Sequence, residues 1–263
     1  MDLKINIRIN YQIVSLFFIL STFLVNGIYA QPILEFKEGY RLYTEYVNCE
    51  FQFIDDREIQ ISSPSDVFIK QLEIIQAIWD RDQIPDRCNV IISYNYANPL
   101  TPDSIISRVD KIEIPVNIPL IKGTKPIANL AYLFVPSKRI NRLVIVHHGH
   151  ACTFRDADLG DAGYRMEATI KGLLASGYDV LAVYMPHITE TECNKNHGIV
   201  INTYLGYKNH KATYGLRLFL EPTIVSLNYL LKQYSYDDIS MIGLSGGGWT
   251  TTLISVIDSR IKY

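Results

Sequence analysis

The chain has no excess of positive charge and no basic stripe. Its 25 lysine and arginine residues are slightly outnumbered by 27 aspartate and glutamate residues, which gives a net charge of −2. Proteins that bind nucleic acid generally carry a clustered positive surface, because phosphate contacts supply much of their affinity. The charge pattern therefore argues against a nucleic-acid partner.

Near its start the sequence lacks an apolar run long enough to cross a bilayer. The run Ile13–Val25 is well short of the about 20 residues that a membrane helix needs. Lys4 and Arg8 precede this run and Ala30 ends a passable cleavage site, so residues 1–30 are predicted to be a signal peptide. We expect a secreted or otherwise extracytoplasmic protein that meets the membrane only through this segment. An uncleaved membrane anchor is the alternative, because the residue two positions before the cut is larger than the usual alanine.

No glycine- or serine-rich linker divides the chain. With 263 residues, 48% of them hydrophobic and 20% charged, the chain has an ordinary globular composition. Residues 31–105 contain no motif for chemistry, and we predict an amino-terminal extension packed on a main domain of residues 106–263. Within the extension, Ser65 is expected to cap a helix whose apolar residues recur at helical spacing as far as Trp79.

Only four cysteines are present. In an exported protein, cysteines are more often joined in disulfides than used for catalysis or metal binding. The favoured pairing joins Cys49 to Cys88 and Cys152 to Cys193, because the second pair would lie in loops that leave two adjacent strands. Four free buried thiols, which a cytosolic location would favour, are the alternative.

Strands and helices alternate along the second half of the chain. A turn separates the first two predicted strands, as in a hairpin, and the shorter apolar runs after them are typical of buried parallel strands. The order strand, helix, strand also predicts a βαβ unit. Pro222 is expected to kink or break the second helix. The predicted strands are Ile106–Val116, Ile127–Val135, Leu143–Val146, Tyr178–Tyr184 and Ile239–Ile242, and the predicted helices are Tyr164–Ser176 and Tyr214–Tyr234.

The last of these strands leads into a GxSxG motif centred on Ser245. This pattern is typical of a serine on a sharp turn between a strand and a helix. Gly243 and Gly247 are needed because a side chain two positions before or after the serine would collide across the turn. The turn exposes the hydroxyl and the helix directs its first N–H groups towards it, so negative charge beside Ser245 would be stabilised. A glycine-rich turn that only joins a strand to a helix is the alternative.

With this motif in this context, residues 106–263 resemble the α/β-hydrolase family of serine hydrolases and esterases. The resemblance implies an α/β fold with a mostly parallel sheet flanked by helices, a nucleophile at Ser245 and no cofactor. It also implies a small-molecule ester or peptide substrate. The oxyanion donors would be the N–H groups of Gly246 and of His150, in the loop after the third strand. Gly149 would let that loop come close to a bound carbonyl.

Three histidines, His147, His148 and His150, stand within four residues of one another. Metallo-β-lactamase-like hydrolases begin their zinc site with a similar HxH at the end of a strand. Their motif continues with an aspartate and a histidine, whereas this chain has Cys152 and Thr153. We therefore predict no metal site. A purely structural role for the imidazoles is the alternative to a role in binding a carbonyl.

After Ser245 the chain contains one acidic residue, Asp258, and no histidine. The resembled family orders its triad as serine, acid and histidine, and Asp258 lies too close to the end of the following helix to orient an imidazole. We therefore expect that the chain is truncated at its carboxyl end, after the nucleophile helix, and lacks the acid and base of the triad. Such a chain would be inactive or weakly active. A non-catalytic α/β-hydrolase-like binding protein is the alternative. The long polar stretch Ile188–Thr213 is predicted to be a cap over Ser245, with a disordered insertion as the alternative.

Overall fold

The computed structural model describes residues 63–116, 127–149, 153–155, 166–186 and 215–262. The chain divides into two units, residues 1–69 and residues 70–263. Helix α3 (Pro64–Trp79) begins in the first unit and continues into the second. The sheet and the other helices that the structure describes belong to the second unit.

Helix α3 is capped by a side chain at its amino end. The Ser63 hydroxyl accepts the N–H of Asp66 at 3.3 Å, and the N–H of Ser63 donates to the Asp66 carboxylate at 2.8 Å. These reciprocal bonds form a capping box, with Pro64 at the first helical position, where its missing N–H costs nothing. The prediction of Ser65 as the cap was therefore wrong by two residues.

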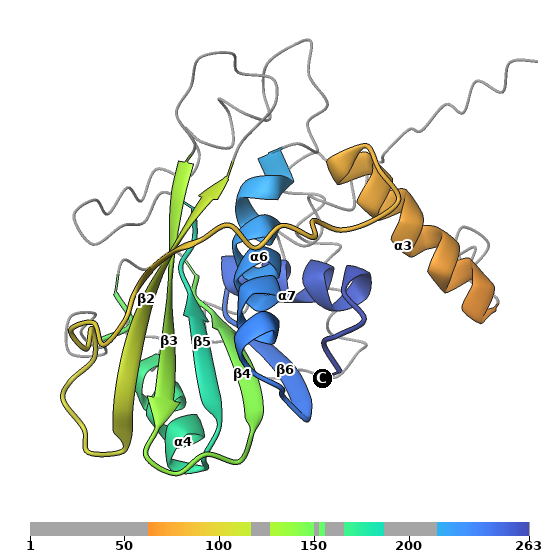
Figure 1. Cartoon of the computed structure of the whole chain (residues 1–263). Coiled ribbons are helices and arrows are strands. Elements are labelled where there is room, and N and C mark those ends of the chain that lie inside the picture. The colour runs from red at the N-terminus through yellow and green to blue at the C-terminus, as the bar shows by residue number, and fades with distance from the viewer. Residues whose placement is uncertain (1–62, 117–126, 150–152, 156–165, 187–214, 263) are drawn as a thin grey trace, which may run out of the picture. The chain divides into compact units, whose positions relative to one another are not determined.

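Six strands form one mixed sheet in the order β1-β2-β3-β5-β4-β6, and helices flank it (Figure 1). The predicted α/β fold class is confirmed. The strands are β1 (Ile91–Ser93), β2 (Ile106–Val116), β3 (Ile127–Pro136), β4 (Arg142–His147), β5 (Asp179–Val183) and β6 (Asp238–Gly243). The helices of the second unit that flank the sheet are α4 (Met166–Ala175), α6 (Arg217–Gln233) and α7 (Gly246–Ile257).

The sheet is antiparallel on one side and parallel on the other. Strands β2 and β3 form the predicted antiparallel hairpin, with Ile106 opposite Pro136 and Val116 opposite Ile127. Strand β3 is also antiparallel to β5, whereas β4 runs parallel to both β5 and β6. Strand β1, which the sequence pattern did not predict, adds a further antiparallel pair on β2. The parallel part is therefore β5-β4-β6, and the carboxyl ends of these three strands meet at one edge.

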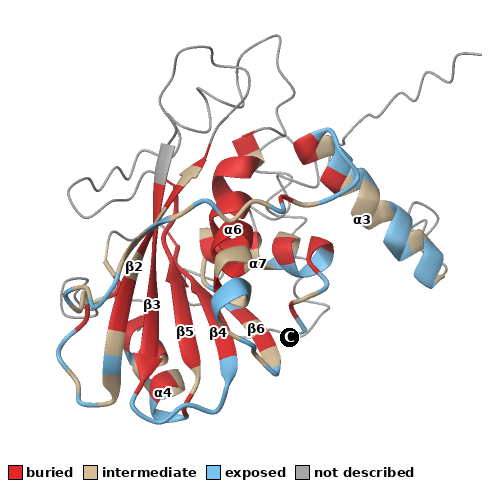
Figure 2. Ribbon diagram, in the orientation of Figure 1, coloured by how far each residue is buried: buried red, intermediate tan, exposed pale blue. Residues whose placement is uncertain are grey.

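Helix α4 covers one face of the sheet, and α6 and α7 cover the other (Figure 1). Every residue of β5 is buried, as are all residues of β4 after Arg142 (Figure 2). This burial on both faces explains why the interior positions of the two strands, Leu143–Val146 and Val180–Val183, are all apolar. Helix α6 runs through Pro222 without a break, and all of its residues from Arg217 to Leu227 are buried. Packing of this segment outweighs the cost of about 3 kcal/mol that an interior proline carries.

The outer edge of β6 is more exposed than the rest of the parallel sheet. Ile242 is 38% exposed, and Gly243 after it is also exposed. Beyond α7 the chain returns to this edge, where the N–H of Lys262 donates to the carbonyl of Ile239 at 3.0 Å. This is the one backbone hydrogen bond that the described residues make to the outer edge of β6, apart from bonds within the sheet itself.

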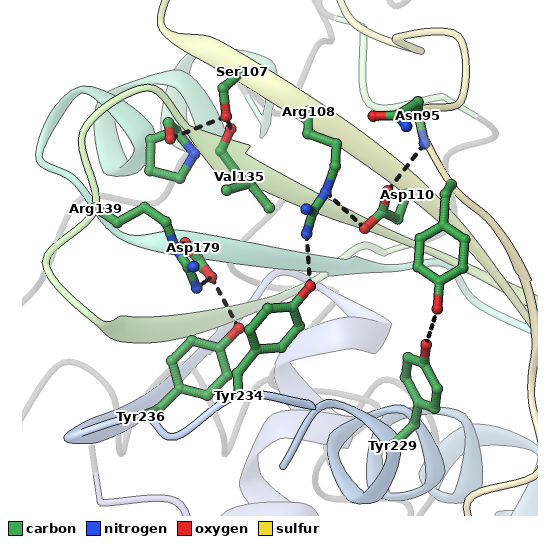
Figure 3. A network of polar contacts seen from close by, with 12 residues as sticks. Asn95, Ser107, Arg108, Asp110, Val135, Arg139, Asp179, Tyr229, Tyr234 and Tyr236 are labelled. Carbon is green, nitrogen blue, oxygen red and sulfur yellow. Dashed lines mark hydrogen bonds and ion pairs between the residues drawn. The ribbon is translucent and has the colours of Figure 1, made fainter. Parts of the chain in front are cut away.

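A buried ion pair joins three segments at the amino end of β5 (Figure 3). Arg139 donates to both carboxylate oxygens of Asp179, at 2.9 Å and 2.5 Å, and the Tyr236 hydroxyl donates to the same carboxylate at 2.9 Å. The hydrogen bond to Asp179 raises the pKa of Arg139, and burial together with the nearby carboxylate raises the pKa of Tyr236. At neutral pH Arg139 therefore stays charged and the Tyr236 phenol stays neutral.

A second set of polar contacts joins β2 and the residue after β1 to α6 and to the segment that follows α6 (Figure 3). Arg108 lies 3.0 Å from the Asp110 carboxylate and donates to the Tyr234 hydroxyl at 2.6 Å. The hydroxyls of Tyr94 and Tyr229 share a hydrogen bond of 2.7 Å. These contacts hold the helix that precedes β6 against the antiparallel half of the sheet.

Candidate active site

Ser245 lies in the two-residue connection between β6 and α7, at the carboxyl edge of the parallel strands. Its backbone angles are φ 54° and ψ −122°, a combination that residues other than glycine rarely adopt. The helix begins immediately afterwards at Gly246, and the N–H of Trp249 donates to the Ser245 carbonyl at 3.2 Å. A strained backbone of this kind costs on the order of 1–3 kcal/mol and is found mainly at functional positions.

The two glycines around the serine leave no room for a side chain. A β-carbon on Gly243 would lie 2.2 Å from the Gly247 carbonyl oxygen and 2.3 Å from Oγ1 of Thr251. A β-carbon on Gly247 would lie 2.1 Å from the carbonyl oxygen of His147 and 2.6 Å from that of His148. Backbone therefore contacts backbone where β4, β6 and α7 meet, and this contact defines the turn that presents Ser245.

The loop after β4 passes directly beside the serine. A β-carbon on Gly149 would lie 2.9 Å from the Ser245 β-carbon, 3.6 Å from its Oγ and 2.9 Å from the Leu244 carbonyl oxygen. Gly149 thus brings bare backbone against the hydroxyl, which is the approach that an oxyanion loop requires. His150, the predicted second donor, lies outside the described residues.

Two N–H groups of the turn are hydrogen-bonded to other described residues, whereas that of Gly246 is not. The N–H of Gly247 donates to the Leu244 carbonyl at 2.9 Å, and the N–H of Leu244 donates to the His147 carbonyl at 3.3 Å. Neither the Gly246 N–H nor the Ser245 hydroxyl has a hydrogen-bond partner among the described residues. A donor at the start of α7 and a neighbouring hydroxyl, neither of them bonded to a described residue, form an arrangement that can stabilise a developing negative charge.

His147 and His148 both serve the packing of β4. His147 is fully buried, and its Nδ1 lies 3.0 Å from the His148 carbonyl oxygen, so Nδ1 carries the proton of a neutral ring. Burial lowers the pKa of His147 to about 4. The ring of His148 packs at 4.8 Å from that of Phe154 and lies parallel to that of Tyr184 at 6.5 Å. Neither ring hydrogen-bonds Ser245, so within the described residues the serine has no general base.

Asp258 has a structural role. Its carboxylate is 1% exposed and accepts two hydrogen bonds from Arg260, from Nε at 2.7 Å and from Nη2 at 2.5 Å. Arg260 also donates to the side-chain carbonyl of Asn228 at 2.6 Å, and Asn228 donates to the backbone carbonyls of Pro85 and Arg87. This chain of contacts ties the end of α7 to α6 and to the segment before β1. The Asp258 carboxylate is therefore used in an ion pair with Arg260.

Several predicted features fall outside the described residues. These are the signal peptide, the predicted cap and the cysteines at positions 49, 152 and 193, so both disulfides stay predictions. The fourth cysteine, Cys88, forms no disulfide with a described residue. In the part of the chain that the structure describes, no helix is both long enough and apolar enough to cross a membrane. The same part holds no cluster of three or more potential metal ligands.

Sequence reasoning missed one residue that contacts the turn, Thr251. The available signal was its spacing, because a threonine in a helix can donate to the carbonyl four residues earlier, here that of Gly247. Three threonines stand side by side at positions 250–252. The sequence does not distinguish the one that faces β6.

Comparisons with known proteins find no matching family model and no matching curated protein. Among solved structures, a Bacteroides fragilis protein classed provisionally as an acetyl xylan esterase matches 75% of this chain at 16% identity with a TM-score of 0.49. A methylesterase matches 82% at 14% identity and a TM-score of 0.43, and Candida antarctica lipase A matches 59% at 12% identity and a TM-score of 0.33. The chain covers 50%, 42% and 35% of these proteins, respectively. By their names the structural neighbours are esterases and a lipase, and the chain spans half of their length or less.

Proposed function

We propose that this protein is a serine hydrolase that cleaves carboxylic ester bonds through an acyl-enzyme on Ser245. The observation that carries the proposal is the conformation of Ser245. A serine held at φ 54° between a parallel strand and a helix presents its hydroxyl beside the N–H of Gly246, which bonds no other described residue. A turn that only connected two elements would have no need to place a side-chain residue in so strained a conformation, since glycine adopts it at lower cost.

The first chemical step is attack of the Ser245 Oγ on the ester carbonyl carbon. A base takes the hydroxyl proton, and the carbonyl oxygen becomes an oxyanion held by the N–H of Gly246. The second oxyanion donor is assigned to the loop that begins at Gly149, with His150 as the proposed residue. Collapse of this intermediate expels the alcohol, which takes up the proton, and leaves the acyl group on Ser245. Water then hydrolyses the acyl-enzyme by the same steps and releases the acid.

The base and its orienting acid come from outside the described residues. A serine hydroxyl is a weak nucleophile at neutral pH without such a partner. Loss of the base typically removes several orders of magnitude of rate, although an oxyanion site alone retains some acceleration over water. The described residues therefore form the half of a catalytic site that holds the nucleophile and the oxyanion.

The substrate class follows from the reaction. We propose a small-molecule ester, with a peptide bond as the variant, and an extracytoplasmic location set by the signal peptide of residues 1–30. The reaction needs no cofactor, because the serine and the backbone N–H groups supply the covalent and electrostatic parts of the chemistry.

Covalent labelling with a fluorophosphonate tests the proposal. The full-length protein, with the catalytic base in place, should be labelled, Ser245→Ala should not be, and Ser255→Ala should be labelled like the native protein. Ser255 is a matched control because it is an exposed serine in the same helix. Labelling that persists in Ser245→Ala would remove the proposal. An unlabelled native protein that is folded would favour a non-catalytic binding protein instead.

A further inference from the structure

Three threonines in α7 make the same local hydrogen bond. Thr250, Thr251 and Thr252 each donate from Oγ1 to the carbonyl four residues earlier, at 3.1 Å, 2.8 Å and 3.0 Å. The three acceptors are Gly246, Gly247 and Gly248, the first three residues of the helix. Such bonds are ordinary in helices and contribute little by themselves. What differs among the three threonines is the surface that each one faces.

Thr251 faces the end of β6. Its Oγ1 lies 2.3 Å from the position that a Gly243 β-carbon would take, and the Gly247 carbonyl oxygen lies 2.2 Å from the same position. The hydroxyl and the carbonyl to which it donates therefore fill the space that the missing side chain of Gly243 leaves. Thr252 makes an equivalent bond but is exposed to solvent and has no such contact.

The carbonyl that Thr251 binds belongs to the residue on which the turn depends. Gly247 donates its N–H to the Leu244 carbonyl at 2.9 Å, which closes the turn around Ser245. On its other side, Gly247 packs against the carbonyl of His147 at the end of β4. Thr251 thus restrains Gly247 from within the helix, while β4 and Leu244 restrain it from the sheet.

We propose that Thr251 is a positioning residue for the nucleophile, acting through Gly247 on the orientation of Ser245 and of the Gly246 N–H. The inference rests on the proposed function, because it concerns the same serine. Thr251 acts through Gly247, and not by direct contact with the substrate. Its hydroxyl limits the tilt of the first helical turn, and a small change in that tilt moves the hydroxyl and the oxyanion donor relative to each other. Displacements of about 1 Å at reacting groups can cost up to about a hundredfold in rate.

The test compares fluorophosphonate labelling rates of the whole protein and three variants. Thr251→Val keeps the shape of the side chain and removes the hydroxyl, Thr251→Ser keeps the hydroxyl, and Thr252→Val removes the equivalent bond on the exposed face. Threonine and valine have similar helix propensities, so Thr252→Val controls for the local effect on the helix. All rates are measured well below the midpoint of thermal unfolding, which is determined for each protein.

We expect Thr251→Val to be labelled about tenfold more slowly than the native protein, in line with a sub-ångström displacement. Thr251→Ser and Thr252→Val should be labelled within about twofold of the native rate. If the valine variant does not fold, Thr251→Ala removes the same hydroxyl without an added methyl group and should show the same loss.

Any of the following results would overturn the inference. Equal labelling rates for Thr251→Val and Thr252→Val would show that the contact with β6 has no influence on Ser245. A loss in Thr251→Val that matches its unfolded fraction, or that Thr251→Ser does not restore, would leave Thr251 with a role in folding alone. A folded native protein without any labelling would overturn the proposed function, and the present inference with it.

Discussion

Replacing Gly247 with alanine gives the most direct measure of how tightly the turn is packed. The added β-carbon would lie 2.1 Å from the His147 carbonyl oxygen, and such contacts are essentially never shorter than 3.0 Å. The start of α7 and the end of β4 must therefore separate by at least 0.9 Å, the difference between these two distances. The atoms involved are backbone, so no side-chain rotation can relieve the clash.

The expected loss of stability is about 2 kcal/mol. Forcing an extra methyl group into a packed site typically costs about 1–3 kcal/mol. Separation of the two elements also weakens the bond from the Leu244 N–H to the His147 carbonyl, and a hydrogen bond contributes about 1 kcal/mol. Against this, alanine is favoured over glycine within a helix by up to about 1 kcal/mol.

The assay is equilibrium unfolding in denaturant, with Gly172→Ala as the matched control. Gly172 also lies inside a helix, α4, but a β-carbon there would have nothing within 4 Å. The control should be more stable than the native protein by about 0.5–1 kcal/mol, because only the helix propensity changes. If Gly247→Ala proves as stable as the native protein, the close contact between β4 and α7 does not hold as described, and the explanation of the Ser245 conformation fails with it.

Three further predictions concern the serine, a buried ion pair and a buried histidine. Ser245→Gly should abolish fluorophosphonate labelling and raise the free energy of unfolding by about 1 kcal/mol. The relief of backbone strain, about 1–3 kcal/mol, exceeds the extra conformational entropy that glycine gives the unfolded chain. A less stable variant would contradict the proposed backbone strain at Ser245. Arg260→Ala should destabilise the protein by about 2 kcal/mol, because it leaves the Asp258 carboxylate, which is 1% exposed, without its partner. The loss is smaller than the 3–5 kcal/mol typical of a broken buried pair, because Arg260 itself is 31% exposed. Thermal unfolding checks this, with Arg142→Ala, at an exposed strand end, as the control. Burial lowers the pKa of His147 to about 4, so this histidine binds a proton more readily in the unfolded chain. Its contribution to stability is therefore complete above about pH 6.5 and falls by about 3 kcal/mol as the pH drops to 4. The free energy of unfolding of His147→Gln should depend less on pH between pH 4 and 7, and an unchanged dependence would refute the buried neutral ring.

The regular elements were predictable because their patterns are local. The bounds of β2 agree with the predicted strand at both ends, and β3 differs by one residue, since apolar alternation and a glycine–proline turn mark them in the sequence. Strand β1 was missed because three residues are too few to show a pattern. The cap of α3 was misplaced because serines stand on both sides of Pro64, and only the carboxylate of Asp66 selects Ser63.

Contacts between distant segments could not be inferred from one sequence. Asp179 meets Arg139 and Tyr236 across separations of 40 and 57 residues, and nothing in the spacing of the three side chains indicates this. At the candidate site, the motif alone indicated the serine and its glycines. The neighbour that restrains them, Thr251, becomes distinguishable from Thr252 only when the helix is placed against β6.

The outer edge of β6 has a consequence for how this chain behaves in solution. A strand edge without a neighbouring strand presents backbone donors and acceptors that can pair with an extended segment of another chain. The last two residues of β6 are exposed, and Ile242 adds an apolar side chain there. In preparations of these 263 residues, the β6 edges of two molecules can pair and form one continuous sheet. Concentration-dependent self-association would then reflect strand geometry rather than any biological assembly, and dilute samples would be the proper material for measuring chemistry at Ser245.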